Sequence, residues 1–135
     1  LNFLGQKAFK RCGWYPNKQY RLFYRQKTKW NNRIVHEMPE MTNTSLGFLQ
    51  GDLLHYLCKN TEEYAAREQK YAILRAGELA KEGKLYAAPV IWAMAAFRFF
   101  RTYILQLGFL KGKTGWNLSL VNARMVYLKY SLAKS

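Results

Sequence analysis

Apolar and polar positions alternate in the first part of the chain, which is typical of extended structure. In residues 20–25 (YRLFYR), side chains alternate between two faces, with Leu22 and Tyr24 on one of them. Residues 34–38 (IVHEM) are expected to form a second short strand, which the following proline would end. Residues 46–58 are apolar with two interior glycines, which predicts a strand with a bulge or bend. Turns are expected at residues 13–19 and 27–33.

From residue 60 onward the apolar period lengthens to that of a helix. Asn60 is placed to cap the first turn, with Glu63 three residues later as its capping-box partner. Glu63 and Arg67 have the four-residue spacing of an ion pair along a helix, and Gly83 is a suitable stop. The pattern therefore predicts a helix over residues 60–83.

Residues 90–110 are apolar over a length that could cross a bilayer, which takes about 20 residues. However, Arg98 and Arg101 lie near the centre of this run, on one helix face, and burying both in hydrocarbon would cost several kcal/mol. We therefore expect either a helix at the lipid headgroup boundary or, equally, a core helix whose arginines reach outward. The candidate membrane contacts are Arg98, Arg101, Lys111 and Lys113.

The last segment, residues 112–135, is expected to be a third helix, and its first four residues, 112–115 (GKTG), are interpreted as the helix–helix turn that leads into it. That tetrapeptide follows a helix and lacks the first glycine of a phosphate-binding loop. The whole pattern predicts an α+β chain in which short antiparallel or mixed strands precede three helices. We divide it into a strand region, residues 1–59, and a helical region, residues 60–135.

Charge narrows the choice of partner. The chain has 22 Lys and Arg against 8 Asp and Glu, a net charge of +14, while 50% of its residues are hydrophobic. A disordered basic tail is therefore excluded, and an anionic partner is expected: nucleic acid, a lipid surface or a phosphorylated substrate. Two cysteines are too few for a disulfide framework, so we expect reduced thiols. No signal peptide is visible, and because the first residue is Leu we expect a piece of a longer protein.

Carboxylates are scarce, which limits the candidate chemistry. Asp52 is the sole aspartate, so the chain has no Asp-x-Asp metal pair, and most glutamates fall in the predicted helix. Carboxylate chemistry therefore falls to Glu37, Glu40 or Asp52. Glu37 follows His36 at the end of a predicted strand, close in sequence to three arginines. It is a candidate general base, or else only an ion-pair partner of those arginines.

Two further kinds of site are open at this point. His36 and His55 with Glu37 could supply metal ligands, but their spacing lacks the helical His-x-x-x-His pattern. For His55 we favour a half-buried imidazole bonded to the backbone over ligation. The basic, aromatic residues 14–30 could stack single-stranded nucleic acid, although strand alternation would turn about half of the rings inward.

Several segments together resemble the C-terminal part of family 2 glycosyltransferases, in particular the bacterial lipopolysaccharide-core and cell-envelope type. They are GWYPNKQYRLFYR (13–25), W and VHE (30 and 35–37), GDLLHY (51–56), FRFFRTYILQLGFLKGKTG (97–115) and YLKY (127–130). Their order and spacing extend over nearly the whole chain. One departure is Lys111 in GFLKG, where the family often has an acid.

The resemblance implies the C-terminal portion of an α/β GT-A fold. It also implies an inverting enzyme that moves a sugar from a nucleotide-sugar to a lipid-linked or envelope glycan acceptor. Glu37 would be the acceptor base, His36 would face the diphosphate or the metal, and Arg21 would orient strand ends or neutralise phosphate. The other acceptor-side or diphosphate-side candidates are Trp14, Tyr15 and His55.

The divalent metal, Mg²⁺ or Mn²⁺, would be held mainly by residues outside this chain, and the chain alone is expected to be inactive. The implied location is the cytoplasmic face of the bacterial inner membrane, as a peripheral protein on an anionic lipid surface. Nucleic acid is not expected as a partner. The rival hypotheses are a non-catalytic basic domain that binds nucleic acid or anionic lipid, and a stand-alone interaction domain.

Overall fold

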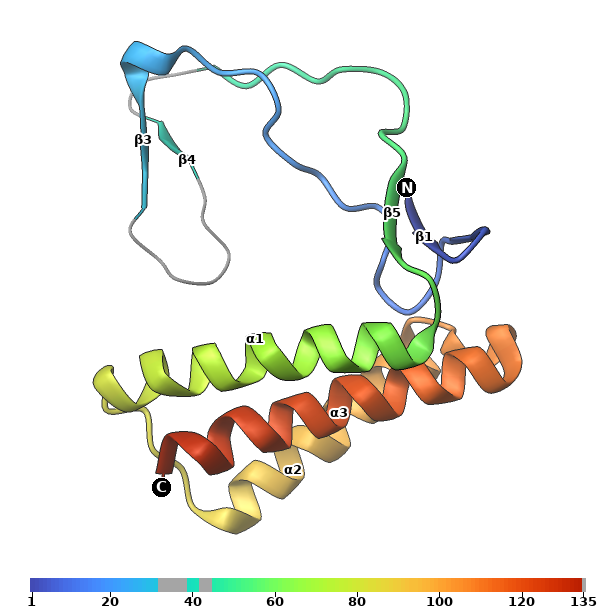
Figure 1. The fold of residues 1–135 in the computed structure, drawn as a ribbon, viewed down its shortest axis with the longest axis vertical. Helices are drawn as coiled ribbons and strands as arrows, with labels where there is room; N and C mark the ends of the chain where they lie inside the picture. Colours follow the sequence, from blue (N-terminus) through green and yellow to red (C-terminus); the bar gives the residue numbers. More distant parts are fainter. Residues whose placement is uncertain (32–38, 42–44, 135) are drawn as a thin grey trace.

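The computed structural model describes residues 1–31, 39–41 and 45–134, and these form an α+β chain in which a small sheet lies above three helices (Figure 1). The helices are α1 (Thr61–Lys81), α2 (Ala88–Phe100) and α3 (Gly112–Lys134), with the π-helical turn η2 (Arg101–Leu105) and the 3-10 turn η3 (Gly108–Lys111) between α2 and α3. The strands are β1 (Asn2–Leu4), β2 (Lys7–Phe9), β3 (Thr28–Trp30), β4 (Pro39–Met41) and β5 (His55–Cys58), with the 3-10 turn η1 (Arg25–Lys27) before β3. The predicted α+β class, with short strands before three helices, is confirmed.

The strands form two separate groups within the described residues. In the first, β1 lies between β2, to which it is antiparallel, and β5, to which it is parallel. In the second, β3 and β4 form an antiparallel pair with Lys29 opposite Glu40. The chain leaves the first sheet after β2, extends away from the helices and returns in β5 (Figure 1). We call this part of the chain the arm; its described residues are 16–31, 39–41 and 45–54.

Several strand boundaries differ from the prediction. Residues 20–24 are irregular and lead into η1, and Leu22 and Tyr24 are each 79% exposed. No core lies under this stretch, so alternation alone does not make it a strand. The expected turn at residues 27–33 instead contains β3, and only His55–Cys58 of residues 46–58 is a strand. The strand expected at residues 34–38 lies outside the described residues.

The predicted helix at residues 60–83 is confirmed as α1, and both of its ends form as the sequence indicates. The backbone N–H of Glu63 donates to Oδ1 of Asn60 at 2.8 Å, which satisfies one of the free amides of the first turn. At the other end Gly83 has a φ of +66°, a conformation that glycine adopts without a steric penalty.

The expected ion pair between Glu63 and Arg67 is wrong. Oε2 of Glu63 instead accepts from the backbone N–H of Lys59 at 2.8 Å, in a variant of the capping box. The guanidinium of Arg67 donates to the carbonyl of Leu57 at 3.2 Å and to Oε1 of Glu68 at 3.1 Å. Arg67 therefore ties α1 to the end of β5.

Removing the cap should weaken the fold measurably. We expect Asn60→Ala to lower the free energy of unfolding by about 1 kcal/mol, because the first turn loses its side-chain acceptor. Urea denaturation followed by circular dichroism measures the change. Asn60→Ser keeps an acceptor and should stay within a few tenths of a kcal/mol of the parent protein. Equal stability of the alanine and serine variants would show that the cap contributes nothing.

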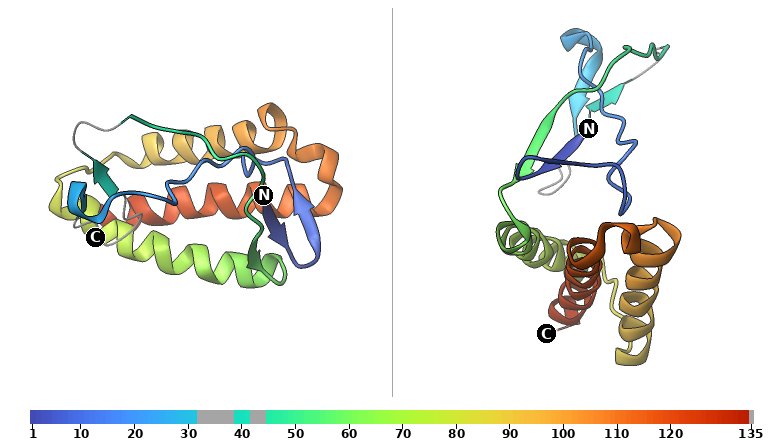
Figure 2. Two further views of the ribbon diagram at one scale, coloured as in Figure 1. Left: turned by 90° about the horizontal axis from the view of Figure 1, so that it is seen from above. Right: turned by 90° about the vertical axis from the view of Figure 1, so that its right-hand side faces the viewer.

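The three helices pack in one layer with α3 between α1 and α2 (Figure 2). Leu118 and Ser119 on α3 are completely buried, and Leu118 packs in the main core against residues of the strands and of α1. The main core joins strand and helix residues: Leu4, Phe9, Cys12, Trp14, Cys58, Tyr64 and Leu118. A smaller cluster at the far end of α1 and α3 consists of Ala76, Leu79 and Ala133.

The apolar run at residues 90–110 is not one helix. α2 ends at Phe100, η2 continues it for one wider turn, and the chain reverses at Leu107, whose φ is +56°. The expected turn at residues 112–115 is therefore wrong, since these residues begin α3. None of the described helices combines the length and the apolarity needed to cross a membrane.

Candidate functional site

A tight turn after β2 is fixed to the corner between α2 and α3. The backbone N–H of Trp14 donates to the carbonyl of Arg11 at 3.2 Å, and Cys12 and Gly13 have φ values of +60° and +75°. The N–H of Cys12 donates to the carbonyl of Gln106 at 3.1 Å. A Cβ on Gly13 would meet only the end of the Gln106 side chain, which can move, so the positive φ is what favours glycine here.

Trp14, which the sequence predicts on the acceptor side, lies in the core. Its ring packs between those of Phe9 and Tyr64, with centroid distances of 5.3 Å to each. Its carbonyl accepts from Nδ2 of Asn2 at 2.9 Å, and the Tyr64 hydroxyl donates to Oδ1 of Asn122 at 3.0 Å. Burial raises the pKa of Tyr64, which keeps this hydroxyl protonated as a donor. Trp14 thus anchors the turn to α1 and leaves Tyr15 outside.

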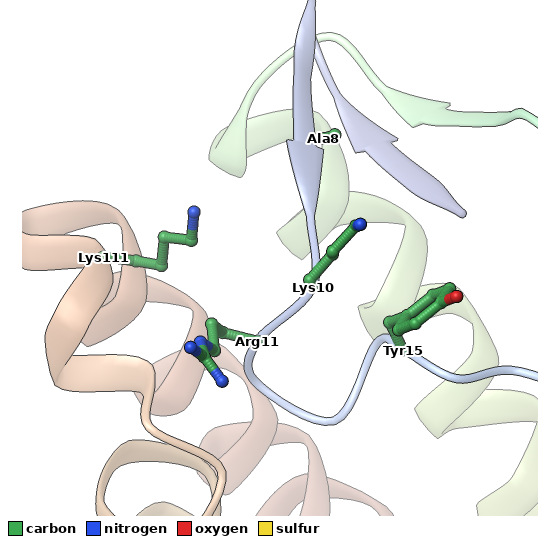
Figure 3. A pocket seen from close by; sticks show the side chains of 5 residues that line it. All are labelled: Ala8, Lys10, Arg11, Tyr15 and Lys111. Atoms are coloured by element: carbon green, nitrogen blue, oxygen red, sulfur yellow. The ribbon is translucent and has the colours of Figure 1, made fainter.

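An open pocket of about 590 Å³ lies between the turn and the corner, and we call it the cationic pocket. Its lining residues are Ala8, Lys10, Arg11, Tyr15 and Lys111. Figure 3 shows Lys111 on one side and Tyr15 on the other, with Lys10 and Arg11 between them on the loop. Residues that are far apart in the sequence meet here, because the Cys12–Gln106 hydrogen bond fixes the loop to the helical corner.

Three positively charged side chains, those of Lys10, Arg11 and Lys111, line the cationic pocket. The Lys10 ammonium lies 5.5 Å from the centroid of the Tyr15 ring, and that of Lys111 lies 5.4 Å from the centroid of the Phe9 ring. These cation–π contacts position both ammonium groups beside the cavity. Over the described ranges, all the ion pairs belong to Arg67, Arg75 and Lys84, so no described acid neutralises the pocket.

The charges and donors of the cationic pocket suit the binding of a phosphate group. A guanidinium offers a fork of donors to phosphate oxygens, and ammonium groups add compact charge. The Tyr15 side chain, which is 38% exposed, lines the same cavity and presents its ring to the Lys10 ammonium. The thiol of Cys12 is buried in the main core, and this burial raises its pKa, so it is not a thiolate nucleophile at neutral pH.

The other predicted acceptor-side residues are placed as follows. His36 and Glu37 lie outside the described residues. Arg21 is exposed on the arm and does not line the cationic pocket. His55 is exposed and its Nδ1 lies 2.9 Å from Oδ1 of Asn2, so the expected half-buried imidazole bonded to the backbone is wrong.

The four predicted membrane contacts separate into three places. Lys111 lines the cationic pocket. Arg98 and Arg101 instead line a second, smaller cavity, together with Lys129. Lys113 is exposed in the first turn of α3 and lines neither cavity.

Sequence reasoning missed Lys10 and Arg11 as site residues. They form a basic pair directly before CGWYP, and in a chain of charge +14 such a pair is only a weak signal. Lys129 was also missed, because only the packing of α2 on α3 brings it near Arg98.

Among the described residues, no three His, Cys, Asp or Glu side chains are grouped closely enough to bind a metal ion. We therefore assign no step to a metal on these residues. No protein-family model matches the chain. No solved structure is a significant match either, so the GT-A fold and the glycosyltransferase family stay predictions from the sequence.

Proposed function

We propose that the chain is the acceptor-side part of an inverting glycosyltransferase at the cytoplasmic face of a bacterial inner membrane. It would move a sugar from a nucleotide-sugar to a lipid-linked or envelope glycan acceptor. The observation that carries this proposal is the cationic pocket, with Lys10, Arg11 and Lys111 around one cavity. A nucleotide-sugar carries a diphosphate, and lipid-linked acceptors carry phosphate or diphosphate, so both suit such a pocket.

Exposed apolar side chains on the helices support a membrane-side location. They lie on α2, η2, η3 and the start of α3: Trp92, Phe97, Phe100, Ile104, Leu105, Phe109, Leu110 and Trp116. The cations Arg101, Lys111 and Lys113 occur along the same stretch. Aromatic rings beside Lys and Arg suit the headgroup boundary of an anionic leaflet, where rings enter the lipid and cations meet phosphates.

The arm supports a further part of the proposal, namely that this chain packs against a nucleotide-sugar-binding half. Residues 45–54 are exposed throughout and carry Leu46, Phe48, Leu49, Leu53 and Leu54. Large apolar side chains grouped on an extended segment indicate a surface that another body covers. The Asp-x-Asp pair and the metal would belong to that other half.

The chemistry assigned to this chain is a proton transfer. Glu37 would accept the proton of the acceptor hydroxyl as its oxygen forms a bond to the anomeric carbon. The bond from that carbon to the diphosphate breaks at the same time, and the nucleoside diphosphate leaves with the electron pair. His36 and Arg21 would face the diphosphate, and Lys10, Arg11 and Lys111 would bind phosphate without taking part in bond making.

A second candidate function is a non-catalytic domain that binds single-stranded nucleic acid. Tyr20, Tyr24 and Trp30 on the arm are 43%, 79% and 55% exposed, so the expectation that about half of these rings turn inward is wrong for them. Exposed rings among arginines and lysines could stack bases. Tight binding of single-stranded RNA with a steep salt dependence, without any sugar transfer, would favour this alternative.

The glycosyltransferase proposal is tested by measuring transfer of labelled sugar from a panel of nucleotide-sugars to a bacterial lipid extract by the intact protein. We expect Arg11→Gln and Lys111→Gln each to raise KM for the phosphate-bearing substrate by about tenfold or more, because each loses a charged contact. The matched controls Arg124→Gln and Lys70→Gln remove exposed cations that line neither cavity. Absence of transfer with every donor refutes the function, while transfer with unchanged KM removes only the pocket from it.

A further inference from the structure

The second cavity is a groove of about 180 Å³ between α2 and α3, and it combines apolar walls with three cations. The cations are Arg98 and Arg101 on one side and Lys129 on the other. The apolar walls come from Met94, Phe97, Val126 and Tyr130. The groove shares no lining residue with the cationic pocket.

The cations of the groove have no ion-pair partner among the described residues. Nε of Arg98 is buried and has no hydrogen-bond partner among the described residues. A buried donor without an acceptor is costly, so an acceptor from outside the chain would stabilise it. None of the ion pairs in the described ranges involves Arg98, Arg101 or Lys129.

Lys129 shows the same lack of an anion. Its ammonium is partly buried, lies 4.8 Å from the centroid of the Tyr130 ring, and has Arg98 and Arg75 nearby. Burial and these two positive charges lower the pKa of Lys129. A bound anion would oppose both effects by offsetting the repulsion among the cations.

We propose that this groove binds the phosphate of a membrane phospholipid. The phosphate oxygens accept from the Arg98, Arg101 and Lys129 side chains, and the first carbons of the lipid chains lie against Met94 and Phe97. The apolar walls favour a lipid over free phosphate. Phe97 is 60% exposed and Trp92 on the same helix is 62% exposed, so apolar surface continues outward from the groove.

This inference rests on the membrane association in the proposed function and does not require sugar transfer. The test is binding of the intact protein to vesicles of equal parts phosphatidylglycerol and phosphatidylcholine. We expect the double variant Arg101→Gln, Lys129→Gln to bind about 20-fold more weakly, because two cations near an anionic surface are lost. Arg124→Gln on the exposed side of α3 is the control and should change binding by less than about twofold.

Short-chain ligands separate a lipid site from a simple phosphate site. Monomeric dihexanoyl phosphatidylglycerol should shift the Nε–H NMR signal of Arg98, whereas glycerophosphoglycerol, the same headgroup without chains, should do so only at much higher concentration. Equal response to both ligands, or equal vesicle binding by the double variant and the control, overturns the proposal. Failure of the parent protein to bind anionic vesicles refutes the membrane association itself. The Arg101→Gln single variant alters only an exposed side chain, so it is the control for loss of binding caused by misfolding of the double variant.

Discussion

Replacing Gly115 with alanine should destabilise the protein by about 3 kcal/mol or more, because backbone occupies the space that a side chain would need. A Cβ at Gly115 would overlap the carbonyl oxygen of Gly108 and lie 2.7 Å from its carbonyl carbon. The neighbouring Leu118 and Ser119 are fully buried, so α3 cannot move away without opening the core. Thermal and urea denaturation of the variant measure the loss.

The chain offers a matched control in Gly77, in the interior of α1. A Cβ there would meet no described atom within 4 Å. Gly77→Ala should therefore raise the free energy of unfolding by up to about 1 kcal/mol, since alanine favours the helix and glycine does not. Equal stability of the Gly115 and Gly77 variants would show that the close approach of α3 to Gly108 does not hold in solution.

The ends of α1 and the chain reversal before α3 differ in how far they could be predicted from the sequence. α1 was predicted with its cap and stop because Asn60 and Gly83 act within a few residues of themselves. The reversal at Leu107 and Gly108 depends on contacts with η2, Cys12 and α3. No local pattern encodes those contacts, so residues 90–110 resembled one continuous apolar helix.

The predicted strand positions were wrong for a related reason. Residues 20–25 have the alternation of a strand, but a strand also needs a partner and a surface beneath it, and the described residues provide neither there. β3 forms instead at residues with a weaker pattern, because Thr28–Trp30 finds Pro39–Met41 as its antiparallel partner. Pairing is a property of two segments, and a single alternating segment cannot reveal it.

The candidate site was predicted in part. Tyr15 and Lys111 were each named from the sequence, for different roles, and the fold brings them to one cavity. Their meeting depends on the backbone hydrogen bond from Cys12 to Gln106, which carries no side-chain signature in the sequence. Lys10 and Arg11 were not singled out, because a basic pair in a chain of charge +14 is unremarkable until its surroundings are known.

Replacing Glu37 with glutamine should lower sugar transfer by the intact protein by about 100-fold to 10,000-fold, the usual contribution of a general base. Glutamine has nearly the same shape but cannot accept the proton of the acceptor hydroxyl, so turnover falls while the nucleotide-sugar still binds. Initial rates of transfer measure the first effect, and titration with the nucleotide-sugar measures the second.

Glu40 provides the control for that experiment from the same segment. It is exposed on β4 opposite Lys29, and Glu40→Gln removes a carboxylate of identical charge three residues away. Glu40→Gln should retain nearly full transfer, since an exposed cross-strand pair has little effect on either folding or catalysis. Undiminished turnover in Glu37→Gln would remove Glu37 from the role of base. A comparable loss in both variants would show that the segment responds to lost negative charge, and proton abstraction by Glu37 would then be refuted as the cause.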